Sequence, residues 1–128
     1  MKQITFKHFL PGIAWFFFVL ILLLIPGSEF PETDNWLKKI YFDKWVHAGL
    51  FGILSFLFMY PFRLRKNPGS IMIIVVILTS LWGLATEFLQ ESLVKGRSFE
   101  LMDWAADTAG SIIAAIIFNM RWRKTQRI

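Results

Sequence analysis

Four long apolar runs dominate the chain, at residues 9–25, 45–62, 71–89 and 104–120. Each is close to the roughly 20 residues that an α-helix needs to cross about 30 Å of hydrocarbon. The apolar positions do not alternate with polar ones, so the runs do not fit β-strands, and four strands could not close a barrel. We predict an all-α polytopic membrane protein, with four transmembrane helices in an antiparallel bundle that forms a single domain over residues 1–128.

Turn-forming residues separate the runs. Pro26-Gly27-Ser28 follows the first run, and Asn67-Pro68-Gly69 lies between the second and the third. The longest connection, residues 26–44, has apolar side chains at helical spacing near its end. This spacing predicts a short amphipathic helix on the membrane surface, at about residues 35–42.

The composition excludes several other classes of protein. Hydrophobic residues make up 55% of the chain and charged residues only 18%, which is more apolar surface than a soluble domain of this size can bury. Disordered chains are poor in aromatic residues, whereas this one contains 17%. The chain has no cysteine, which excludes a disulfide framework, a zinc–thiolate site and a cysteine nucleophile.

The distribution of charge predicts the orientation in the membrane. Basic residues without acidic neighbours flank one side of the predicted bundle: Lys2, Lys7, Arg63, Arg65, Lys66, Arg121, Arg123, Lys124 and Arg127. By the positive-inside rule both termini face the cytoplasm, and we place the protein in the plasma membrane as a multi-pass protein. These basic residues are divided among membrane edges, so they favour contact with anionic lipid and give no nucleic-acid-binding face.

Ionisable residues inside the runs all lie near the opposite, predicted outer side. His47 is close to the start of the second run, Glu87 to the end of the third and Asp107 to the start of the fourth. A carboxylate within the bilayer costs about 3 kcal/mol, so such groups usually face the bundle interior and serve a function. We predict one outer pocket with ligand-binding residues from three helices: Asp43, Lys44, His47, Glu87, Gln90, Arg97, Asp103 and Asp107. Asp103 is also a candidate N-cap of the fourth helix.

The same residues carry a family resemblance. Asp43-Lys44-Trp45-Val46-His47 and Glu87-Phe88-Leu89-Gln90 resemble the D-K-x-x-H and E-x-x-Q motifs of VanZ-like membrane proteins. Gly96–Asp103 resembles the G-R-S-x-x-x-x-D motif of that family, and Asp107–Gly110 occupies the place of N-x-x-G, with Asp where Asn is usual. The resemblance implies a role in the cell envelope and in reduced sensitivity to glycopeptide antibiotics, notably teicoplanin.

These observations support three hypotheses. In the first, Lys44 and Arg97 hold a phosphate or carboxylate, and acidic and amide side chains bind hydroxyls or amines of a lipid headgroup, a lipid-linked glycan or a lipoglycopeptide. In the second, the protein is a membrane-embedded enzyme of envelope lipids or glycans, with no cofactor beyond a divalent cation. Its catalytic or metal-binding candidates are His47, Glu87, Asp103 and Asp107. In the third, the polar residues only hold the helices of a structural scaffold together.

Overall fold

The computed structural model describes residues 3–25 and 41–123, and every regular element in them is helical. The elements in chain order are η1 (Phe6–Phe9), α1 (Leu10–Leu24), α3 (Phe42–Met59), η3 (Tyr60–Phe62), α4 (Gly69–Leu93) and α5 (Leu101–Arg123). The predicted all-α class is therefore confirmed. Residues 35–40 of the predicted surface helix lie outside the described residues, and Phe42 already belongs to α3.

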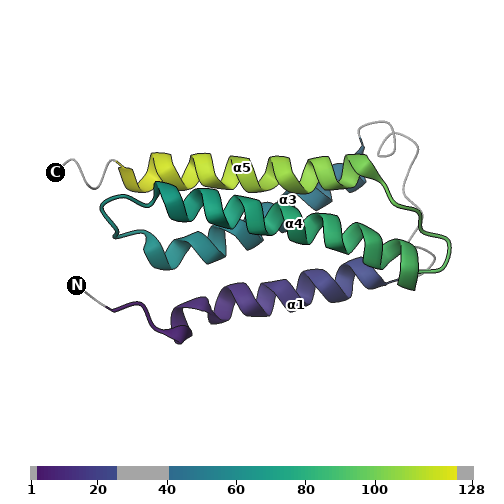
Figure 1. Cartoon of the computed structure of the whole chain (residues 1–128), viewed down its shortest axis with the longest axis horizontal. Coiled ribbons are helices and arrows are strands. Elements are labelled where there is room, and N and C mark those ends of the chain that lie inside the picture. The colour runs from purple at the N-terminus through teal and green to yellow at the C-terminus, as the bar shows by residue number, and fades with distance from the viewer. Residues whose placement is uncertain (1–2, 26–40, 124–128) are drawn as a thin grey trace.

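The long helices form an elongated antiparallel bundle (Figure 1). α3 and α5 make the most extensive contact, α4 packs against both, and α1 packs on α3 and α4. The start of η1, the connection from α3 to α4 and the end of α5 lie at one end of the bundle. The start of α3, the end of α4 and the start of α5 therefore meet at the other end.

Four helical segments of the described chain are long and apolar enough to cross a membrane: Phe6–Leu24, Phe42–Phe62, Gly69–Leu93 and Leu101–Trp122. This confirms the prediction of four membrane-spanning helices. Three of them extend further than the apolar runs, because α3 begins at Phe42, α4 ends at Leu93 and α5 begins at Leu101. The added residues include polar ones that face other helices, so an apolar run marks only part of each helix.

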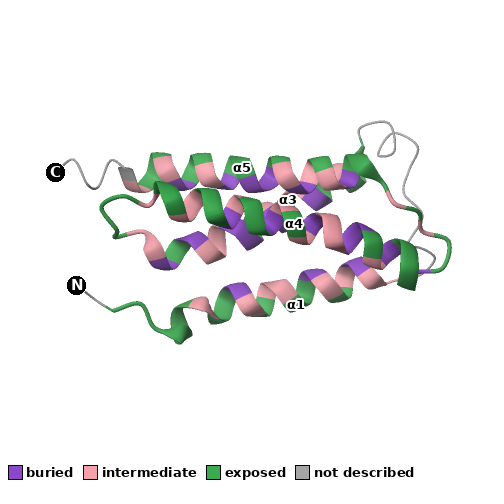
Figure 2. Ribbon diagram, in the orientation of Figure 1, coloured by how far each residue is buried: buried purple, intermediate pink, exposed green. Residues whose placement is uncertain are grey.

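Small residues bring α3 and α5 into close contact. A Cβ atom on Gly110 would overlap the backbone of Ala48, and a Cβ on Gly52 would lie 3.1 Å from the carbonyl oxygen of Gly110. Glycine at these positions therefore sets the distance between the two helices, as small residues commonly do in membrane bundles. Figure 2 shows buried residues on the facing sides of the helices and exposed residues on the outside.

Apolar side chains fill most of the interior in two groups. One surrounds Phe51 and Leu54 of α3 with Val19 of α1, and the other joins Met59 and Phe118. Between them, the hydroxyl groups of Ser55, Thr79 and Ser111 bond to one another at 2.8 to 3.0 Å. These hydroxyl contacts link α3, α4 and α5 in mid-bundle and give each hydroxyl a hydrogen-bond partner inside the bundle.

Candidate functional site

Ionisable side chains gather where α3 begins, α4 ends and α5 begins. His47 on α3, Glu87 on α4, and Asp103 and Asp107 on α5 each have between 0% and 4% of their surface exposed. With the surrounding charged residues they form what we call the polar cluster: Asp43, Lys44, His47, Glu87, Glu100, Asp103 and Asp107. On α3, Lys44 and His47 are three residues apart, and on α5, Asp103 and Asp107 are four apart, so each pair lies on one face of its helix.

His47 is held by Asp107. The imidazole Nδ1 lies 2.8 Å from Asp107 Oδ1, and a ring nitrogen that faces a carboxylate carries a proton, so Nδ1 donates to Asp107. A neutral ring in this tautomer has its free electron pair on Nε2, which lies 3.6 Å from Oδ2 of Asp103. The Asp107 side chain fits because α4 presents Gly83, where an added Cβ would lie 2.9 Å from Oδ2.

Lys44 is enclosed by three carboxylates. Its ammonium lies 2.7 Å from Asp43, 2.6 Å from Glu100 and 2.5 Å from Asp103. The three pairs use all three protons of the ammonium, which leaves none for an external anion. In this structure Lys44 therefore balances the acidic side of the cluster, which differs from the anion-holding role that the sequence suggested.

Glu100 is a member of the cluster that the sequence interpretation did not select. Its carboxylate pairs with Lys44, and its backbone N–H donates to Oε2 of Glu87 at 3.2 Å. The connection between α4 and α5 is thereby tied to both α3 and α4. A sequence signal did exist, because Glu100 lies three residues before Asp103 and thus next to it at the start of α5.

Three further predicted residues have contacts that the sequence did not indicate. Gln90 is buried, but its amide donates to the carbonyl of Leu23 at 2.9 Å, in the last turn of α1 where carbonyls lack helical partners. Arg97 makes a backbone bond to Val94, and its guanidinium pairs with no carboxylate of residues 3–25 and 41–123. Asp103 lies within the first turn of α5, so it is not the N-cap.

Several buried oxygen atoms of this region have no hydrogen-bond partner within the described residues: Glu87 Oε1, Gln90 Oε1 and Asp107 Oδ2. An unpaired buried acceptor costs about 1–3 kcal/mol, and native proteins keep few of them. The cluster also holds five carboxylates against one ammonium and one imidazole. Its chemistry therefore suits a donor of hydrogen bonds or a cation.

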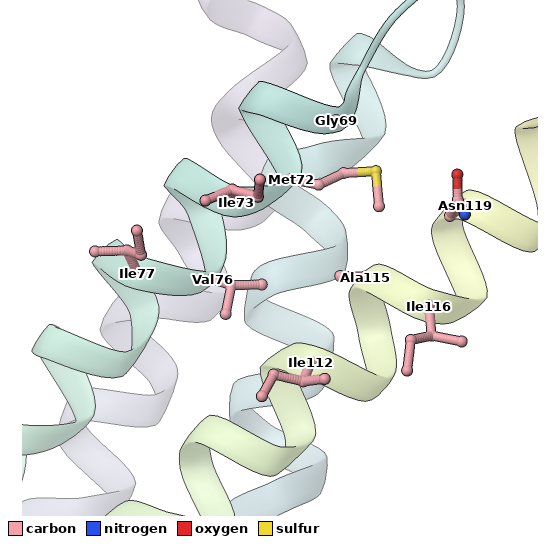
Figure 3. A pocket seen from close by; sticks show the side chains of 9 residues that line it. All are labelled: Gly69, Met72, Ile73, Val76, Ile77, Ile112, Ala115, Ile116 and Asn119. Carbon is pink, nitrogen blue, oxygen red and sulfur yellow. The ribbon is translucent and has the colours of Figure 1, made fainter.

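A hollow lies toward the end of the bundle opposite the polar cluster. It is a groove of about 420 Å³ between α4 and α5 (Figure 3). Its lining is apolar apart from Asn119: Gly69, Met72, Ile73, Val76, Ile77, Ile112, Ala115 and Ile116. It offers no acid, base or charged group, so it adds no chemistry to the polar cluster.

Comparison with known proteins places these residues in a family. Neither a curated protein nor a solved structure matches the chain. The sequence model of the VanZ/LLP1 family, however, matches residues 5–122, which include all four membrane-spanning helices and the whole polar cluster. The chain therefore belongs to the VanZ/LLP1 family and is a multi-pass membrane protein.

Proposed function

We propose that this protein lies in the plasma membrane and binds the polar headgroup of a membrane-anchored envelope molecule at the polar cluster. The ligand is an envelope lipid, a lipid-linked glycan or a lipoglycopeptide, which share an apolar anchor and a headgroup rich in hydroxyl and amino groups. Binding would modulate the properties of the envelope or its sensitivity to such antibiotics. The unpaired buried acceptors Glu87 Oε1 and Asp107 Oδ2, beside His47, carry the proposal.

The charges of the site define what the headgroup must offer. Carboxylate oxygens without partners require donors, which hydroxyl and ammonium groups supply. Lys44 is already engaged, whereas Arg97, on the connection between α4 and α5, has a guanidinium without a carboxylate partner among the described residues. A phosphate or carboxylate of the same headgroup would therefore pair with Arg97 through its bidentate fork.

Mass spectrometry of lipids retained by the purified protein tests this proposal. The parent protein, extracted in native membrane discs, should be enriched in one headgroup class over the surrounding membrane. Glu87→Gln, which keeps the shape and removes the charge, should lose the enrichment, and Glu91→Gln on the exposed side of α4 should keep it. Equal lipid composition in all three proteins would contradict the proposal and favour a purely structural cluster.

A sensitivity assay separates an antibiotic ligand from a native lipid. Cells that produce the parent protein should tolerate teicoplanin better than cells with an empty vector, and Glu87→Gln should abolish the difference. If only lipid enrichment depends on Glu87, the headgroup belongs to the membrane and the antibiotic is not a ligand.

The pairing of His47 with Asp107 favours a second candidate function, acid–base catalysis on the bound headgroup. A carboxylate on Nδ1 fixes the tautomer and leaves Nε2 able to accept a proton, which is how histidine serves as a general base. Incubation of the protein with an envelope lipid extract should then convert one lipid species into another of different mass. His47→Ala should stop the conversion, whereas His8→Ala, at an exposed histidine of η1, should not.

A further inference from the structure

We infer that His47, Glu87 and Asp103 form a binding site for one divalent cation of the first transition row, Zn²⁺ or Mn²⁺. The three residues come from three different helices and are all buried. Each offers one ligand atom, and these atoms all lie within 4.8 Å of one another. The inference deepens the proposed function, on which it rests, because it names the ion that the headgroup would meet in the cluster.

The spacing of the ligand atoms suits a metal ion. Bonds of about 2.1 Å place two ligands of a tetrahedral ion about 3.4 Å apart. Nε2 of His47 lies 3.6 Å from Oδ2 of Asp103, which is close to that separation. Glu87, on α4, supplies a third ligand atom within 4.8 Å of the other two, so the three atoms form a triangle.

Each of the three side chains is anchored through one atom and leaves a second atom for a ligand. Nδ1 of His47 bonds to Asp107, Oε2 of Glu87 accepts the N–H of Glu100, and Oδ1 of Asp103 pairs with Lys44. The atoms that remain are Nε2, Oδ2 of Asp103 and Oε1 of Glu87, the last of which has no partner within the described chain. Glu87 is 1% exposed, so water does not readily supply that partner.

In many metal sites a carboxylate bonds to the ring nitrogen of histidine that does not bind the metal, and Asp107 has this place beside His47. Such a carboxylate accepts the proton of the far ring nitrogen, orients the imidazole and makes the near nitrogen a better ligand. The hydrogen bond of 2.8 Å between Nδ1 and Asp107 Oδ1 provides this support. Because both side chains are buried, the support is rigid and the site is formed before the ion arrives.

A neighbouring group of carboxylates, Asp43, Glu100 and Asp103, also has closely spaced oxygens. That group already surrounds a cation, the ammonium of Lys44. In the buried group Lys44 pairs only with Oδ1 of Asp103, Glu87 has no lysine or arginine partner among the described residues, and the imidazole is bound to Asp107. The buried group is therefore the one that an added cation would complete.

The ligand set indicates the kind of ion. One imidazole nitrogen and two carboxylates suit Zn²⁺ or Mn²⁺ better than Mg²⁺ or Ca²⁺, which prefer oxygen ligands alone. The polar cluster holds five carboxylates against the single ammonium of Lys44, so the two charges of the ion would be compensated within the cluster. Three protein ligands leave at least one coordination position open, where a phosphate or hydroxyl of a bound headgroup could attach.

Titration calorimetry with metal chlorides tests the site. The full chain, purified in detergent without a histidine tag and stripped with a chelator, is titrated with ZnCl₂, MnCl₂ and MgCl₂ in turn. We expect one Zn²⁺ or Mn²⁺ per chain, with binding at least about tenfold weaker in His47→Ala and in Glu87→Gln. The matched controls His8→Ala and Glu91→Gln, both at exposed positions, should bind as the parent does.

Two further measurements distinguish the loss of the metal site from misfolding of a variant. Thermal unfolding of the parent should shift upward on addition of the preferred ion, and the shift should disappear in Glu87→Gln. Asp107→Asn keeps all three ligands and should still bind the ion, but about 10–100-fold more weakly. Unchanged affinity in a folded His47→Ala, or no saturable binding to the parent, would overturn the metal site.

Lipid analysis of the protein in native membrane discs, set beside the titration, separates this inference from the proposed function. If the parent enriches a headgroup class yet binds no ion, headgroup binding stands and the metal site is wrong. If it binds the ion through His47 but enriches no lipid, the metal site stands and headgroup binding is wrong.

Discussion

The imidazole of His47 and the carboxylate of Asp107 are joined by a hydrogen bond of 2.8 Å between two different helices, α3 and α5. Both side chains are buried; His47 directly precedes Ala48, and Asp107 lies three residues before Gly110, so the pair lies beside the close contact between Gly110 and Ala48. The polar contact and the close backbone approach therefore support each other. The predictions below test this arrangement and the charges around it.

Removing the acceptor of His47 should destabilise the bundle. In Asp107→Ala the buried Nδ1–H loses its partner, which should cost about 2 kcal/mol. Asp107→Asn keeps an acceptor oxygen and places there the residue usual in VanZ-like proteins, so its cost should be below about 1 kcal/mol. Thermal or denaturant unfolding in detergent measures both, with the exposed Glu91→Ala as control.

The ion pair between Lys44 and Asp103 should be the strongest of the three at this lysine, because Asp103 is the buried partner. Lys44→Met leaves a buried carboxylate without its cation and should destabilise the protein by about 3 kcal/mol. Adding Asp103→Asn should recover at least about 1 kcal/mol of that loss in a double-mutant cycle. Lys95→Met, at an exposed lysine, should change stability by less than about 0.5 kcal/mol.

Two glycines of the bundle should respond oppositely to alanine. Gly110→Ala places a methyl group into the backbone of Ala48, so α3 and α5 must separate, at a cost of about 1–3 kcal/mol or more. Gly49 of α3 has no atom within 4 Å of an added Cβ, so Gly49→Ala should be neutral or stabilising by up to about 1 kcal/mol. Equal unfolding temperatures for the two variants would argue against the close contact.

Thiol labelling checks the predicted orientation. The chain lacks cysteine, so each substitution introduces its single thiol. Lys95→Cys, between α4 and α5, should react with an impermeant reagent in intact cells, and Lys66→Cys, between α3 and α4, should react only after the membrane is opened. The reverse result would mean that the polar cluster faces the cytoplasm.

Arg97 should matter through the shape of its guanidinium as well as its charge. Arg97→Lys keeps the charge but loses the bidentate fork, so enrichment of a phosphate-bearing lipid should fall by about threefold or more. Arg121→Lys, at an exposed arginine of α5, serves as the control. Full enrichment in Arg97→Lys would exclude bidentate recognition.

The sequence predicted the helices better than it predicted their contacts. Apolar runs of near-bilayer length identify membrane-spanning helices because the physical requirement is simple. The partner of each polar side chain depends on how the helices are rotated about their axes and how closely they approach one another. These features depend on packing in three dimensions, as at Gly110 and Gly83, where a larger side chain would not fit. From their positive charge alone, Lys44 and Arg97 were predicted to bind the same anion. In the structure Lys44 is surrounded by carboxylates, and Arg97 pairs with none of the described ones. Glu100 acts partly through its backbone N–H, which residue type does not reveal.

The pairing of α3 with α5 also bears on how the chain is made. α3 is synthesised before α5, so Lys44 and His47 reach the membrane before Asp103 and Asp107 exist. Their position near the start of α3 allows the charged end of Lys44 to stay in the water at the interface during that interval. Once α5 is inserted, its carboxylates replace this water. The ion pairs of Lys44 are thus completed only when α5 is inserted, and a chain arrested before α5 would leave Lys44 at the edge of the bilayer with Asp43 but without Glu100 and Asp103.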